Sequence, residues 1–235
     1  MSKVKTLFFV VNFCFLSLSC FAQSESINTD RPDQSDGVNT ISKNKFQIEN
    51  GITISKETIL NNFMLRFGVS NSTELRLLAD FGKENNIRGL KPLTLSIKQK
   101  LIEQNRIIPA ISLVGYASVN RLASKSFQED GMSTLLKIAF ENELSEKFSL
   151  GYNIGFLDDF DDLSLSSGLS YAPNETISTF IEYFSTLDEF EQEHNIDAGI
   201  LIILIPTLQI DFALGHALFT EEDRFFTTLG ISYML

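Results

Sequence analysis

Charged residues of both signs recur along this sequence at positions that alternate with apolar ones. Within each short segment they stand two residues apart, or a multiple of two, so they share one face of an extended strand. Charges enclosed on such a face would pair with one another, or would form a constriction that selects what passes. The residues we expect to line an interior are Glu49, Arg66, Glu74, Arg76, Asp80, Lys98, Lys100, Lys137, Glu141, Glu182, Asp197 and Asp211.

The apolar partners of these charges show what must position them. Phe46, Ile48, Ile52 and Ile54 alternate with polar residues, and about eleven later segments repeat the pattern at roughly ten residues each, a length that crosses a bilayer as a tilted strand. No segment after the first residues is long and apolar enough for a membrane helix, so a barrel is the remaining way to satisfy every backbone group in lipid. The alternation is weakest over Ile107–Val119, which leaves the strand count open by about two.

The connections favour a membrane barrel over a soluble sandwich. Short links, such as Asn71-Ser72 and Pro206-Thr207, alternate with mostly longer and more charged ones. Short periplasmic turns and longer outer loops are typical of outer-membrane barrels. The sequence therefore predicts an all-β antiparallel transmembrane barrel of about twelve strands over residues 44–235, with Phe, Leu and Ile facing lipid.

The beginning of the chain has the pattern of an export signal. Lys3 and Lys5 precede an apolar stretch, Leu7–Leu18, and Cys20-Phe21-Ala22 offers small residues at a cleavage site. We expect a signal peptide over residues 1–22 and a periplasmic N-terminal segment over 23–43; a lipidated Cys20 is the alternative. Because both cysteines, Cys14 and Cys20, lie in the signal, the cleaved chain would have no disulfide.

The overall charge limits the partners. The net charge of −11 at pH 7 argues against nucleic acid, whose phosphates would repel the chain. The partners we expect are outer-membrane lipids, the barrel assembly machinery and a small molecule, and we expect a monomer. The assembly machinery would read the C-terminal pattern of Gly230, Tyr233 and Leu235.

Three acidic runs lie in segments expected to be outer loops. A solvated rim is one interpretation and calcium binding is the other, since calcium takes several oxygen ligands. None of the runs has the spacing of an EF-hand, so we expect no metal. The runs are Asp158, Asp159, Asp161 and Asp162; Asp188, Glu189, Glu191 and Glu193; and Glu221, Glu222 and Asp223.

Signals for catalysis are few. The histidines are His194, in an expected charged loop, and His216, expected to face outward at a rim. Neither has a Gly-x-Ser-x-Gly partner, and no phosphate loop, dinucleotide fingerprint or zinc spacing occurs. We expect no cofactor and no enzyme; an outer-membrane lipid hydrolase and a purely structural barrel are the alternatives.

Two groups of short motifs resemble a known family. The N-terminal group is Thr29-Asp30-Arg31-Pro32-Asp33-Gln34-Ser35 with Lys45-Phe46-Gln47-Ile48-Glu49-Asn50-Gly51. The C-terminal group is Asp197-Ala198-Gly199, Pro206-Thr207-Leu208-Gln209-Ile210-Asp211 and Gly230-Ile231-Ser232-Tyr233. Together they resemble the meta-pathway-of-phenol-degradation (MetA-type) outer-membrane β-barrel family. The resemblance implies a porin-like channel or transporter for small aromatic or hydrophobic molecules, in the outer membrane of a Gram-negative bacterium.

The N-terminal motif, Thr29, Asp30, Arg31, Pro32 and Asp33, precedes the first expected strand. Its charges are close together, and Pro32 stiffens the stretch. We expect the stretch to enter the periplasmic mouth and pair with wall charges, as a plug. The alternative is an anchoring turn with no role in transport.

Overall fold

The computed structural model describes residues 26–157, 162–188, 192–220 and 224–235. The expected signal peptide, residues 1–22, lies outside these ranges. No described segment is a helix long and apolar enough to cross a membrane.

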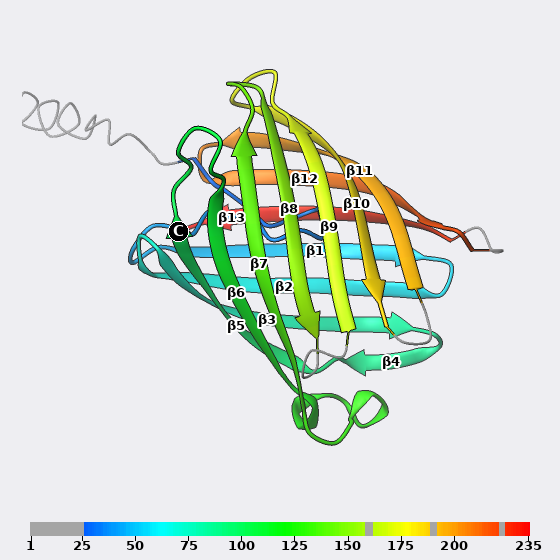
Figure 1. The fold of residues 1–235 in the computed structure, drawn as a ribbon. Coiled ribbons are helices and arrows are strands. Elements are labelled where there is room, and N and C mark those ends of the chain that lie inside the picture. Colours follow the sequence, from blue (N-terminus) through cyan, green and yellow to red (C-terminus); the bar gives the residue numbers. More distant parts are fainter. Residues whose placement is uncertain (1–25, 158–161, 189–191, 221–223) are drawn as a thin grey trace, which may run out of the picture.

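Thirteen strands form one antiparallel sheet. Each strand pairs with its neighbours along the chain, except that β5 pairs with β3 and not with β4. β1 also pairs with β13, from Gln47 opposite Met234 to Ser55 opposite Phe226. Without the short hairpin strand β4, these pairings leave a closed barrel of twelve strands (Figure 1). The strands are β1 (Phe46–Ser55), β2 (Thr58–Ser70), β3 (Thr73–Glu84), β4 (Ile87–Leu90), β5 (Leu93–Ile102), β6 (Ala110–Val119), β7 (Met132–Glu143), β8 (Phe148–Leu157), β9 (Asp162–Tyr171), β10 (Ile177–Leu187), β11 (Gln192–Ile205), β12 (Leu208–Leu218) and β13 (Phe225–Met234).

The distribution of polar and apolar side chains is the reverse of that in a soluble protein. Arg66 and Lys98 are 0% exposed, whereas Leu95 and Ile97 are 59% and 49% exposed. Lys98 and Ile97 are neighbours on β5, so the pleat alone places one inside and the other outside. An apolar outer wall around a polar interior is the arrangement of an outer-membrane barrel, and the predicted fold and location are confirmed.

Aromatic side chains gather on the outer wall near both rims. Phe46 contacts Phe67 with ring centroids 4.6 Å apart, and Phe148 contacts Tyr171 at 4.7 Å, both at the end that holds the short turns. At the opposite end the rings of His216 and Phe225 are 4.3 Å apart. Such girdles lie at the two membrane–water interfaces, and short turns are typical of the periplasmic side of an outer-membrane barrel.

Several boundaries differ from the sequence-based prediction. The expected loop from Gly82 to Lys91 holds the end of β3 and all of β4, paired from Phe81 opposite Leu90 to Glu84 opposite Ile87. Residues 107–109 are not part of a strand, because β6 begins at Ala110. Strands β10 to β12 run further outward than expected, so His194 lies on β11, not in a loop. Polar residues can continue a strand ladder beyond the bilayer, so the alternation of apolar residues does not predict where such a strand ends.

The prediction that phenylalanine faces lipid is wrong for three rings. Phe180 and Phe184 stand two residues to either side of Glu182, and Phe226 stands two residues before Thr228, so all three share the inner face. Phe184 and Phe226 meet edge to face across the interior, with centroids 6.1 Å apart. The small residue Gly215 lies opposite Phe226, and a Cβ there would collide with that ring.

The two faces predict different responses to charge. Replacing Ile97 by lysine puts a cation into lipid near the middle of β5, and should cost about 2–4 kcal/mol of unfolding free energy. Thr94→Lys, on the inner face of the same strand, is the matched control and should cost less. Urea unfolding in phospholipid vesicles measures both; equal losses would contradict the assignment of the faces.

Candidate functional site

The stretch before β1 runs through the interior of the barrel. We call residues 27–41 the lumen segment; in Figure 1 it is the blue trace enclosed by the strands. It enters beside the periplasmic turn, where the Ile27 amide donates to the carbonyl of Pro206 at 2.7 Å, and it leaves where the Ile41 amide donates to Glu74 Oε2 at 2.8 Å. Between these points Val38 packs against Ala110 and Ala139.

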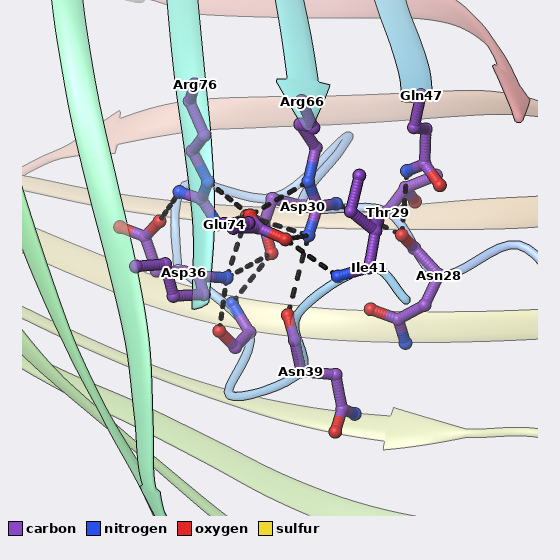
Figure 2. A network of polar contacts seen from close by, with 12 residues as sticks. Asn28, Thr29, Asp30, Asp36, Asn39, Ile41, Gln47, Arg66, Glu74 and Arg76 are labelled. Atoms are coloured by element: carbon purple, nitrogen blue, oxygen red, sulfur yellow. Dashed lines mark hydrogen bonds and ion pairs between the residues drawn. The ribbon is translucent and has the colours of Figure 1, made fainter. Parts of the chain in front are cut away.

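Asp30 is the centre of a buried ion-pair network (Figure 2). It contacts the guanidinium of Arg76, and Lys98 Nζ lies 3.0 Å and 2.9 Å from its two carboxylate oxygens. Arg66 approaches the same carboxylate at 4.0 Å. Burial alone would raise the pKa of Asp30, but Arg76, Lys98 and Arg66 together lower it to about 2.

Asp36 repeats this pattern toward β6 and β7. Its carboxylate accepts from Arg76 Nη1 at 2.7 Å and from the Tyr116 hydroxyl at 2.5 Å, and Lys137 Nζ lies at 3.1 Å. Burial opposes ionisation here too, but Lys137, Arg76 and Lys98 hold the pKa of Asp36 well below its usual value. The backbone of Asp36 also exchanges two hydrogen bonds with the Asn153 side chain, at 2.6 Å and 3.1 Å.

The wall of this network carries more positive than negative charge. Its cations are Arg66, Arg76, Lys98 and Lys137, and its acids are Glu49, bound to Arg66 at 2.7 Å, and Glu74, bound to Arg66 at 2.9 Å and Arg76 at 2.6 Å. Asp30 and Asp36 of the lumen segment supply the missing negative charges. Removing one partner of a buried pair costs about 3–5 kcal/mol, so the segment and the wall depend on each other.

Arg31 reaches in the opposite direction, to β13 and β12. Its Nη2 donates to Thr228 Oγ1 at 2.7 Å and lies 3.5 Å from Asp211 Oδ1. The guanidinium crosses Gly51 and Gly230, which are direct partners in the β1–β13 register. A Cβ at either glycine would collide with the Arg31 side chain, so the two glycines form the notch that admits it.

The environment of Asp33 is acidic, in contrast to that of Asp30. Glu182 on β10 accepts from the Gln34 amide at 2.7 Å and from the Ser35 hydroxyl, and Asp197 lies opposite Glu182 in the ladder. Both carboxylate oxygens of Asp197 are buried and accept no hydrogen bond from the described residues. Burial, Glu182, Asp30 and Asp197 all raise the pKa of Asp33 well above its usual value.

The structure brings most of the residues expected inside into contact with the lumen segment. Lys100 donates to Asn39 Oδ1 at 3.1 Å. Asp80 instead accepts from Asn62 at 3.2 Å and forms no hydrogen bond or ion pair with the described residues of the segment, and Glu141 lines a hollow beside the periplasmic turn at Ser145. The expected residues that contact the segment are Glu49, Arg66, Glu74, Arg76, Lys98, Lys100, Lys137, Glu182 and Asp211.

Uncharged residues that hold the segment were missed by the sequence analysis. They include Gln47, which donates to the Asn28 carbonyl at 2.8 Å, and Ser112, which donates to the Val38 carbonyl at 2.6 Å. Most share the parity of the charged residues on their strands, so the alternation contained a signal for them. The full set is Gln47, Ser112, Tyr116, Asn153, Ser166, Gln209 and Thr228.

The remaining predicted residues have no role in this network. His194 bonds to the Tyr183 hydroxyl at 2.6 Å on the outer wall. Tyr233 and Leu235 are exposed at the end of the chain. Among the described residues no cluster of three or more Asp, Glu, His or Cys side chains is placed to hold a metal ion. Most residues of the three acidic runs, at 158–161, 189–191 and 221–223, lie outside the described residues.

The depressed pKa of Asp30 predicts how the lumen segment responds to acid. Because that pKa is about 2 in place of 3.8, the ionised form stabilises docking above pH 3.8, and this stabilisation is lost as the pH falls from 3.8 toward 2. Asp36 shifts in the same direction. Single-channel conductance should therefore rise as the pH falls below about 4, where Asp30 becomes protonated, whereas the raised pKa of Asp33 acts in the opposite direction at higher pH and favours docking. A rise that is complete well above pH 4 would contradict the assignment.

Comparison with solved structures identifies the same architecture in other outer-membrane proteins. The COG4313 outer membrane channel from Pseudomonas putida F1 superposes with a TM-score of 0.64 at 13% identity, covering 87% of this chain and 100% of that one. The KdgM porin gives a TM-score of 0.64 at 6% identity, and the NanC porin 0.61 at 6%; each match covers 80% of this chain and 98% of the porin. At these identities the likeness concerns the fold.

Sequence comparison gives the family. No curated protein sequence matches the chain significantly. Residues 29–235 match the family described as "Putative MetA-pathway of phenol degradation", from the Asp30 motif to the last residue. The chain belongs to this family of outer-membrane β-barrels.

Proposed function

We propose that this barrel is a passive channel for small molecules, aromatic or otherwise hydrophobic, and that the lumen segment is the plug that controls their passage. The observation that carries the proposal is the attachment of one segment to the inner wall on many sides. It binds β3 and β5 through Asp30, β8 through Asp36, β10 through Gln34 and β13 through Arg31. A segment held across the interior must move, or leave a narrow gap beside it, for anything to pass.

Most of these contacts can be replaced by water when the segment moves. They are hydrogen bonds and ion pairs in a polar interior, whereas the buried apolar side chains of the segment are Ile27 and Ile41 at its two ends and Val38 between them. A polar contact contributes little net free energy when water can satisfy both partners. The segment differs in this respect from the strands, because lipid cannot replace the hydrogen bonds between strands and the ladders therefore cannot open.

The class of compound that we propose to pass through the barrel is inferred from the family description and from the side chains on the inner wall. The family description concerns phenol degradation. Inside this barrel Phe180, Phe184 and Phe226 present rings to the interior, and a water-filled pore for ions alone would gain nothing from them.

The proposal extends to the partners of the protein and to the absence of enzymatic activity. The protein acts as a monomer, and the assembly machinery recognises Gly230, Tyr233 and Leu235. An enzyme is disfavoured because His194 lies on the lipid-facing side of the rim, and its described contacts with Tyr183 and Phe219 include no carboxylate that could orient it as a general base.

A reversible cross-link tests whether the plug must move. Ser35 Oγ and Ser166 Oγ are 2.7 Å apart, so cysteines at both positions would be within disulfide reach. We expect Ser35→Cys/Ser166→Cys to conduct less in planar bilayers when oxidised and to recover with reductant. The single variant Ser35→Cys is the control. Equal conductance in the oxidised and reduced states would overturn the role of the plug.

The glycine notch offers a second test, without a cross-link. Gly51→Ala places a methyl group where Arg31 lies, and so should displace the plug, raise conductance and expose a cysteine introduced at Val38 to maleimide. Gly151→Ala is the matched control, because its Cβ would meet no atom closer than 4.0 Å. If Gly51→Ala folds with unchanged conductance and an unreactive Val38→Cys, the notch does not hold the plug. A barrel that stays silent in every plug variant would favour the structural alternative.

A further inference from the structure

A cavity of about 410 Å³ lies inside the barrel, on the extracellular side of the lumen segment. Its floor is Arg31–Gln34, and its walls are the inner faces of β1, β2 and β3 with Thr228 of β13. Ligand sites usually measure about 300–1,000 Å³ and combine an apolar lining with a few polar groups, so this volume suits a single ring or a short chain.

One wall of the cavity is apolar, although the inner face is polar elsewhere on these strands. Leu60 and Met64 share the parity of Arg66 on β2, and Leu78 shares that of Arg76 on β3. Met64 and Leu78 are direct partners in the ladder, and Leu60 is only 6% exposed. Met64 lies opposite Glu49 of the ion-pair network in the β1–β2 register, so the apolar patch begins beside that network and lines the cavity.

A single acid beside this patch retains hydrogen-bonding capacity. Asp80 follows Leu78 on the same face of β3, and Oδ1 accepts from Asn62 Nδ2 at 3.2 Å. The other wall acids of the cavity are already paired, Glu49 with Arg66 at 2.7 Å and Glu84 with Lys91 at 2.8 Å. Asp80 forms no ion pair with any described residue, so it can accept a hydrogen bond from a ligand.

The electrostatics favour a neutral ligand. Asp80, Glu49 and Glu84 would repel an anion, while the Arg31 side chain in the lining and Lys91 paired with Glu84 disfavour a cation. What remains is an acceptor next to an apolar surface.

We propose that this cavity binds a small uncharged amphipathic molecule, whose apolar body packs on Leu60, Met64 and Leu78 and whose hydroxyl group donates to Asp80. The inference rests on the proposed function, because such a site would hold the compound before the plug admits it. It narrows the substrate class to apolar molecules with a hydrogen-bond donor.

Three probes of similar size separate the chemistries: 4-ethylphenol, which has a donor; 4-ethylanisole, which has none; and 4-ethylbenzoate, an anion. Binding to the protein in lipid nanodiscs is measured by calorimetry, with empty nanodiscs subtracted. We expect the phenol to bind about tenfold more tightly than the anisole, the scale of a hydrogen bond to a charged acceptor. The benzoate should bind least.

Two variants assign the contacts. Asp80→Ala should bring the phenol down to the affinity of the anisole, with Glu141→Gln, an acid in the periplasmic part of the interior, as the control. Leu78→Ser should weaken both neutral probes alike, and Leu201→Ser, on the inner face of β11, should weaken neither.

The outcomes separate this site from the channel function. No saturable binding, equal binding of phenol and anisole, or a benzoate that binds most tightly would each overturn the site, whatever the plug variants do to conductance. Binding with the expected order in a barrel that never conducts would support the site and overturn the channel function.

Discussion

The requirement that buried charges be paired governs this structure. Inside the barrel the cations Arg66, Arg76, Lys98 and Lys137 outnumber the wall acids Glu49 and Glu74 that they contact. An unpaired charge of this kind is costly away from bulk water. Asp30 and Asp36 bring the balancing charges from a segment outside the sheet, so the wall of the barrel and the stretch before β1 form one electrostatic unit.

The lumen segment is held by different chemistry in three directions. Toward β3, β5 and β7 it inserts carboxylates among cations. Toward β10 it presents the Gln34 amide and the Ser35 hydroxyl to Glu182, beside the buried carboxylate of Asp197. Toward β13 it places Arg31 over facing glycines. The segment is therefore attached by ion pairs on one side and by hydrogen bonds beside an acidic surface on another.

Much of the fold and part of the site could be predicted from the sequence. Alternation in segments such as Phe46–Ser55 predicted strands, because the pleat of a strand and the contrast between lipid and lumen have the same period of two. The same parity brought Arg66, Arg76 and Lys98 inward. It failed for Phe180, Phe184 and Phe226, since an apolar residue at an inward position looks like a break in the pattern, and for β4 and the outer part of β11, where no lipid imposes the alternation.

The sequence by itself determined which side chains share a face, that the chain closes into a membrane barrel, and that the stretch containing Asp30 and Arg31 carries charges for the interior. Only the tertiary structure decided which of these charges meet. Asp30 lies 68 positions before Lys98 and Arg31 lies 197 before Thr228. Such pairs depend on closure of the β1–β13 ladder and on the space left by Gly51 and Gly230. A local pattern of residues predicts neither of these, because both arise from strands far apart in the sequence.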